Sequence, residues 1–186
     1  GMLTGCYPNR IGFDLFDGIP VLFPGQPVGL NPEENTIAGL LKREGYATKL
    51  VGKWHCGDQP EFLPTNHGFD SYFGLPYSND MGRQGGRGEF AKKLQKEVAC
   101  NYLGPDAEDL DTDFPPLPLM DNDAVLQEQP DQAALTERYV GEAVRFIREN
   151  REQPFFLYFA HMYVHLPIYV PEKFLNASNN GRYGAA

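Results

Sequence analysis

Lys53 and His55 stand two residues apart in the stretch VGKWHCG, directly after a short apolar run. A lysine ammonium is a compact point charge, and a histidine can donate a hydrogen bond or a proton near neutral pH. Ser78 in YSND could add a hydroxyl donor, and His165 in VHLP adds a second imidazole. These residue types suit a tetrahedral anion, so the sequence raises the hypothesis of an anion site.

Each of these residues also has a plain structural interpretation. A Lys-Trp-His triplet by itself is typical of a protein surface, and the hydroxyl of Ser78 could cap a turn instead of contacting a ligand. We interpret His161 in AHM and His67 in TNHG as packed structural residues, and Trp54 as a core or wall residue. The elements around them decide between the two interpretations.

Two helix-strand units are expected to position these side chains. Asn35 or Thr36 can cap a first helix that Gly45 ends, and the strand YATKLVGKW follows. The stretch 130–153 has an apolar stripe at helical spacing, and PFFLYFAHM then reads as a buried parallel strand. In open α/β sheets the ligand site lies beyond the carboxyl ends of the strands. Polar residues after both strands should therefore meet at one edge of the sheet.

The remaining stretches are expected to be less regular. The first thirty residues are rich in Gly and Pro, and residues 57–90 are predicted to be loop. Residues 89–99 could form a short helix, and residues 104–130 carry many Pro and Asp residues that favour irregular structure. The fold class predicted from the whole pattern is α/β, with a mainly parallel sheet flanked by helices.

Composition excludes several classes of function. The 186 residues suffice for one domain, and their net charge of −9 argues against a nucleic-acid partner. No apolar run is long enough to span a membrane, so no membrane partner is expected. Cys6, Cys56 and Cys100 have no metal-ligand spacing, which makes structural zinc improbable, and each could be a buried thiol.

Several stretches taken together resemble the type I sulfatases of the arylsulfatase A kind, within the alkaline phosphatase superfamily. MLTGCYPNRIG is similar to the end of the family's first signature, which begins C-x-P-S-R. NTIAGLLKREGYATKLVGKWHCG resembles the second signature, G-Y-x-T-x-x-x-G-K-W-H-x-G. PTNHGFDSYFGLPYSND and QPFFLYFAHMYVHLPIYVPEKF resemble the two segments that follow, in the family's order.

The resemblance implies an enzyme that hydrolyses sulfate monoesters of small molecules or glycans. Its nucleophile would be a formylglycine made from the signature Cys, and a divalent cation, usually calcium, would hold the sulfate. Carried over by motif, Lys53 contacts sulfate, His55 helps expel it from the covalent intermediate, and His165 is a candidate general acid. Ser78 would contact sulfate as well. Parent enzymes of this kind are commonly periplasmic or secreted.

The sequence also departs from the family pattern. No C-x-P-S-R motif occurs, and Cys6 falls after Thr4-Gly5, where the family commonly has Arg, so it is not expected to be the nucleophile. The metal-binding Asp residues are expected outside this chain. We therefore expect residues 1–186 to be part of a sulfatase catalytic domain, inactive alone and prone to self-association. The alternatives are a non-catalytic remnant, a weak anion-binding module, or a phosphoryl-transfer relative.

Overall fold

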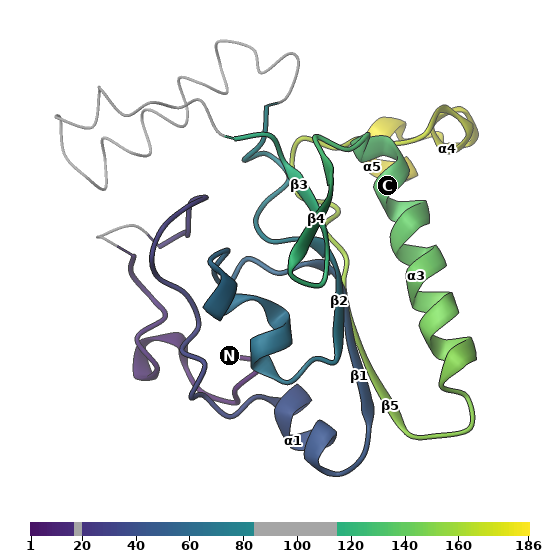
Figure 1. The fold of residues 1–186 in the computed structure, drawn as a ribbon. Helices are drawn as coiled ribbons and strands as arrows, with labels where there is room; N and C mark the ends of the chain where they lie inside the picture. The colour runs from purple at the N-terminus through teal and green to yellow at the C-terminus, as the bar shows by residue number, and fades with distance from the viewer. Residues whose placement is uncertain (17–19, 84–114) are drawn as a thin grey trace, which may run out of the picture.

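The computed structural model describes residues 1–16, 20–83 and 115–186 of the chain. Its centre is a five-stranded sheet with the strand order β4-β3-β2-β1-β5 (Figure 1). The strands are β1 (Ala47–Lys53), β2 (Ser71–Leu75), β3 (Pro118–Asp121), β4 (Ala124–Glu128) and β5 (Phe155–Ala160). The α-helices among the described residues are α1 (Ile37–Arg43), α3 (Leu135–Glu149), α4 (Glu172–Ala177) and α5 (Gly181–Ala185). Short 3-10 turns are η1 (Pro8–Arg10), η2 (Pro60–Phe62), η3 (Pro64–His67) and η5 (Gln132–Ala134).

The sheet is mixed. β1 lies between β2 and β5 and is parallel to both, whereas β2-β3 and β3-β4 are antiparallel pairs. The predicted α/β class is confirmed, and the parallel part of the sheet is its three strands β2, β1 and β5. Those three strands carry the residues of interest at their carboxyl ends.

Alternation along the strands builds a hydrophobic core on each face of the sheet. Val51 and Phe73 point to the face covered by α3, where Leu135 and Tyr139 pack against them. Their neighbours Leu50 and Tyr72 belong to a second core on the opposite face, with Ala38 of α1, Trp54, Leu63 and Phe69. Successive residues of a strand point to opposite faces of the sheet. Two neighbouring apolar residues of each strand therefore contribute one side chain to each core.

Helix α1 begins and ends where the sequence predicts. The Thr36 hydroxyl caps it by accepting a hydrogen bond from Gly39 N–H at 3.0 Å, and Gly45 follows its end with φ +83°. Only Ala38 of this short helix is buried, while Ile37 and Leu40 are 41% and 49% exposed. The apolar spacing therefore predicted the helix correctly but not the burial of its stripe.

Helix α3 is the long helix expected in the second unit. The Asp131 carboxylate accepts from Ala133 N–H at 3.0 Å and caps the turn η5 that leads into it. The predicted stripe is buried at Leu135, Tyr139, Ala143 and Phe146. Ile147, also assigned to that stripe, is 40% exposed.

Two regions predicted to be irregular contain strands. Strand β2 lies inside the predicted loop 57–90 and is buried in the middle of the sheet. Its Gly74 faces Gly52 of β1, and a Cβ at position 74 would lie 1.8 Å from the Gly52 carbonyl oxygen. A five-residue strand that contains a glycine gives a weak strand signal, because glycine contributes no side chain to a strand pattern.

The second correction concerns the predicted irregular region 104–130. Residues 118–128 form the hairpin β3-β4, and Asn122 opens its two-residue turn with φ +53°. Asparagine tolerates this backbone region and is typical of such turns. The helix proposed over residues 89–99 lies outside the described residues.

Strand β5 is parallel to β1 as predicted, but it is an edge strand. Its side chains are mostly half-buried, and Phe159 is 39% exposed. The prediction of a fully buried strand was wrong because nothing among the described residues pairs with its outer side. Within the described residues, no helix combines the length and apolar character that crossing a bilayer would need.

Candidate anion site

Lys53 ends β1 on the side of the sheet that faces α3. Alternation places Lys49 on the same side, and there its ammonium forms a partly buried ion pair with Glu142 of α3 at 3.1 Å. Lys53 differs, because none of the ion pairs found among the described residues includes it. Its Nζ instead donates a hydrogen bond to the Ser78 Oγ at 3.2 Å. The lysine at the end of the strand thus keeps a positive charge without a carboxylate in contact.

Ser78 lies in the turn that follows the neighbouring strand β2. The β1-β2 ladder continues past the strand ends, since His55 N–H donates to the Pro76 carbonyl at 2.9 Å. Ser78 follows two residues later and is 1% exposed. Its hydroxyl oxygen lies 3.3 Å from His165 Nε2. Lys53, Ser78 and His165 therefore form one continuous hydrogen-bonded line across the carboxyl ends of β1, β2 and β5.

The tautomer of His165 follows from its second ring nitrogen. His165 Nδ1 lies 2.7 Å from the Leu166 carbonyl oxygen, which can only accept a hydrogen bond. The neutral ring then carries its proton on Nδ1 and accepts from the Ser78 hydroxyl at Nε2. Protonation would place a second N–H on Nε2. This N–H could then donate a hydrogen bond to an anion bound beside Lys53 and Ser78.

His55 is held by a different contact. Its Nε2 lies 3.0 Å from the Leu22 carbonyl oxygen, so Nε2 carries the proton and Nδ1 is left as the free nitrogen. The residue also has φ +57°, a left-handed conformation that is uncommon away from glycine. Such strain persists only where surrounding structure imposes it, and it clusters at functional sites.

Burial shifts the proton affinities of both basic groups. Desolvation lowers the pKa of Lys53, and the negative charge of Asp80 opposes that shift. The pKa of His55 is also lowered, first by burial and then by the charge of Lys53. Asp80, two residues beyond Ser78, thus favours the charged form of both residues, a role that sequence reasoning missed.

The other histidines lie outside this line, as their structural interpretation predicts. His161 Nδ1 accepts a hydrogen bond from Tyr163 N–H at 3.1 Å within its own loop. His67 is 3% exposed and packs on Trp54, with ring centroids 5.4 Å apart. Trp54 is itself buried and donates to the Phe62 carbonyl at 2.8 Å.

Among the described cysteines, Cys56 does not offer an activated thiol. Burial raises the pKa of Cys56 to about 12, which leaves a neutral thiol next to His55. Cys6 heads the string Cys-Tyr-Pro-Asn-Arg, which shares Cys, Pro and Arg with C-x-P-S-R but has Asn9 in the place of Ser. Its recorded hydrogen bond runs from its own N–H to Thr4 Oγ1 at 3.4 Å. The expectation that Cys6 is not the nucleophile stays a prediction.

The described residues do not form a cation site. Over 1–16, 20–83 and 115–186, no three His, Cys, Asp or Glu side chains gather closely enough to hold a metal ion. The calcium that the resemblance implies therefore finds no fitting set of ligands in this part of the chain.

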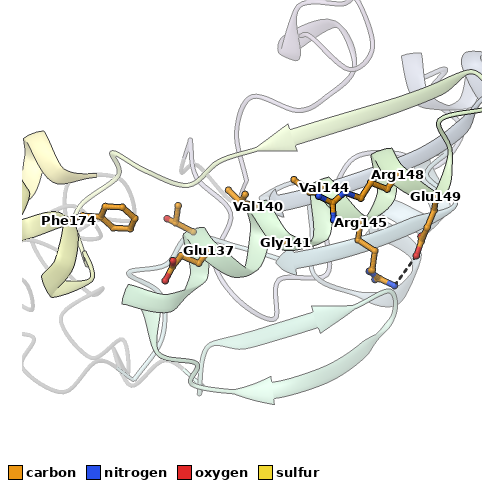
Figure 2. Close-up of a pocket in the computed structure, with 9 residues that line it drawn as sticks. Glu137, Val140, Gly141, Val144, Arg145, Arg148, Glu149 and Phe174 are labelled. Carbon is orange, nitrogen blue, oxygen red and sulfur yellow. Dashed lines mark ion pairs between the residues drawn. The ribbon is translucent and has the colours of Figure 1, made fainter.

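A large cavity lies elsewhere. A groove of about 720 Å³ runs along the outer side of α3 toward α4. Figure 2 shows Val140, Gly141 and Val144 along its floor, Phe174 at one end, and Arg145 paired with Glu149 at the other. The groove is open and mostly apolar, and its charges are on long surface side chains. Its chemistry does not match the cation, hydroxyl and imidazole line at the strand ends.

Comparison with known proteins agrees with the motifs. The Sulfatase family model matches residues 1–184. Bovine arylsulfatase A is 36% identical over 187 residues, which cover 98% of this chain and 34% of that protein. Human N-acetylgalactosamine-6-sulfatase is 35% identical over 189 residues, covering 100% of this chain and 33% of the relative. The chain spans about a third of the length of these relatives.

Solved structures support the same assignment. The structure described as Ps i-CgsB in complex with k-i-k-neocarrahexaose superposes with a TM-score of 0.69 and 27% identity, over 99% of this chain and 39% of that one. The PsFucS1 sulfatase from Pseudoalteromonas sp. shares the fold with a TM-score of 0.69 at 22% identity, over 99% of this chain and 37% of that one. The chain belongs to the sulfatase family, and its fold is that of the alkaline phosphatase-like sulfatases.

Proposed function

We propose that this chain contributes the sulfate-binding half of a sulfuric ester hydrolase, an enzyme that hydrolyses sulfate monoesters. The observation that carries the proposal is the line Lys53 Nζ, Ser78 Oγ, His165 Nε2, with contacts of 3.2 and 3.3 Å. It combines a cation, a hydroxyl donor and a proton-switchable ring at one sheet edge. Membership of the sulfatase family supports sulfate as the anion.

The proposed roles follow from where charge develops. As the sulfur–oxygen bond of the ester breaks, negative charge grows on the sulfate oxygens and on the departing alkoxide. Fixed donors stabilise such charge most effectively in a site that is partly shielded from water. Lys53 and Ser78 would bind sulfate oxygens, and protonated His165 would give its Nε2 proton to the leaving oxygen.

His55 would act on the other side of the reacting sulfur. Its Nε2–H is occupied by the Leu22 carbonyl, so its Nδ1 is the atom available to accept a proton. Its lowered pKa keeps the ring neutral near pH 7, as a proton acceptor requires. We also propose a formylglycine nucleophile and a calcium ion for the whole enzyme. Both belong to the proposal through family resemblance.

The proposed substrate is a sulfated small molecule or a sulfated glycan. One relative is named as acting on N-acetylgalactosamine 6-sulfate, and one structural neighbour is described with a bound neocarrahexaose. Both names concern sugars, which favours a sulfated glycan. We further propose a periplasmic or secreted parent enzyme, on family resemblance alone.

The competing proposal is an anion-binding module without catalysis. It is favoured by one observation, the lack of a C-x-P-S-R motif in these 186 residues. Both proposals require sulfate to bind at Lys53. They differ in whether the full-length enzyme that contains this chain cleaves an aryl sulfate such as 4-nitrophenyl sulfate.

The test begins with sulfate binding. Isothermal titration calorimetry of the chain with sodium sulfate near pH 6 should give a measurable affinity. Lys53→Gln should weaken it about tenfold or more, because a hydrogen bond to a charged group is lost. Lys173→Gln is the matched control, since Lys173 is an exposed lysine on α4 that pairs with Glu137.

Two outcomes would contradict the proposal. Equal weakening by both lysine substitutions would mean that sulfate responds only to net charge. Unchanged affinity in Lys53→Gln would remove the site altogether. Release of 4-nitrophenol by the full-length enzyme that disappears in Lys53→Gln would instead favour the hydrolase over the binding module.

A further inference from the structure

A pair of buried amides lies directly behind the proposed anion site. Asn79 and Gln132 are 0% and 3% exposed, and they are 53 residues apart in the chain. Asn79 Nδ2 donates to Gln132 Oε1 at 3.0 Å, and Gln132 Nε2 donates back to the Asn79 carbonyl oxygen at 3.0 Å. The two residues thus exchange hydrogen bonds in both directions, with little freedom left for either side chain.

This pair also holds the loop that carries His165. Asn79 Nδ2 makes a second hydrogen bond, to the Pro167 carbonyl at 3.2 Å. On the other side of His165, the Tyr163 hydroxyl donates to the Gln132 carbonyl at 3.0 Å. The loop is therefore anchored two residues before His165 by the Gln132 backbone carbonyl, and two residues after it by the Asn79 side chain.

The other end of the pair fixes Ser78. Asn79 is its direct neighbour, and the turn that contains both is closed by Met81 N–H donating to the Ser78 carbonyl at 3.0 Å. Three segments that are far apart in the sequence meet here: the turn after β2, the turn before α3 and the loop after β5. His165 is solvent-exposed, so its own packing cannot hold it against Ser78.

We infer that the Asn79–Gln132 pair is the positioning device of the site, holding His165 Nε2 within hydrogen-bond reach of Ser78 Oγ. The inference rests on the proposed function for its purpose, but its geometry is independent of it. Both amides act through Ser78 and the His165 loop, so we assign them as positioning residues and not catalytic ones. A small displacement of a catalytic group can reduce its effect by orders of magnitude, which is why such an anchor matters.

Gln132→Met tests the inference, because it keeps the side-chain length and removes the two hydrogen bonds that hold Asn79 in place. The Tyr163 hydrogen bond to the Gln132 backbone carbonyl remains in this variant. In the variant without sulfate, the His165 ring signals in a ¹H–¹³C NMR spectrum should move toward those of a solvent-exposed histidine. Sulfate affinity should fall about tenfold, as expected for losing one well-placed donor. Asn150→Leu is the control, since it removes a side-chain hydrogen bond to Phe146 at the far end of α3.

The pair is merely structural if Gln132→Met and Asn150→Leu lose comparable stability in urea while His165 and sulfate affinity stay unchanged. Tyr163→Phe is the milder second variant and decides the question if Gln132→Met fails to fold. It removes only the anchor before His165 and should weaken sulfate binding about two- to threefold in the same direction. If the unaltered chain binds no sulfate, the proposed function fails, while the His165 ring signals still decide whether the pair positions that ring.

Discussion

At the scale of single residues, the neighbouring side chains decide what each basic side chain can do. Lys49 and Lys53 lie on the same strand and the same face, yet only Lys49 has a carboxylate partner. Lys53 keeps its charge next to a hydroxyl and an imidazole, which is an arrangement suited to binding an anion. The difference comes from the neighbours of each lysine, because residue type and strand position are shared.

His67 is the residue for which burial predicts a clear pH effect. Its ring is enclosed against Trp54, and burial lowers its pKa to about 4, outweighing the weak opposing pull of the Phe62 carbonyl. In the unfolded chain the pKa of histidine is about 6.5. Between these values the unfolded chain binds a proton that the folded chain does not, so stability is lost as the pH falls from about 6.5 to 4.

We expect that loss to reach about 2–3 kcal/mol, by the conversion of about 1.4 kcal/mol per pKa unit. Urea unfolding at a series of pH values measures it. His67→Leu should flatten the dependence, although His55, whose pKa is also lowered by burial, keeps a smaller slope in the same direction. His161→Leu should retain the slope of the unaltered chain. An unchanged slope in His67→Leu would show that this ring does not govern the acid limb.

At the scale of elements, the close approach of β1 and β2 brings the site together. The register pairs Gly52 with Gly74, and β1 ends one residue later at Lys53. A side chain at either glycine would push the neighbouring strand away just before the functional side chains. The short strand β2 was hard to predict because the glycine that permits this packing also weakens the strand pattern.

Gly74→Ala should therefore destabilise the fold by about 3 kcal/mol, since the new Cβ would overlap the Gly52 carbonyl oxygen. The free energy of unfolding in urea gives the comparison. Gly141→Ala is the matched control, because Gly141 lies in α3 with no atom within 4 Å of the added Cβ. There alanine should stabilise by about 0.5–1 kcal/mol through its higher helix propensity. Similar effects at both positions would disprove the packing argument.

At the scale of the whole molecule, two surfaces of the described structure lack a partner. The outer side of β5 has unpaired backbone groups, and Val140, Val144 and Ile147 of α3 are 37–46% exposed. β5 carries no charged residue, so two copies could pair edge to edge without repulsion between like charges. We propose that a second copy of this chain covers the β5 edge, with the two β5 strands antiparallel and related by a two-fold axis.

Sedimentation velocity over a range of concentrations tests this association. The chain should form dimers as the concentration rises, and Phe159→Lys on β5 should reduce them at least tenfold, because a charge would have to be buried in the interface. Val125→Lys places the same charge on β4, the opposite edge of the sheet, and should leave dimers intact. A monomer at every concentration would contradict the proposal, and loss of dimers only in Val125→Lys would assign them to the other edge.

The sequence by itself predicted some of the local elements and the residue types of the candidate site. The capped helix before β1, the long helix α3, the strand β5, and Lys53, His55, Ser78 and His165 all came from spacing, turn residues and motifs within short stretches of chain. Only the tertiary structure decided what those residues touch. The line from Lys53 to His165, the Asn79–Gln132 pair and the insertion of β2 into the sheet join segments 20 to 90 residues apart. Such contacts depend on how strands pair and pack, and local patterns carry no record of that choice.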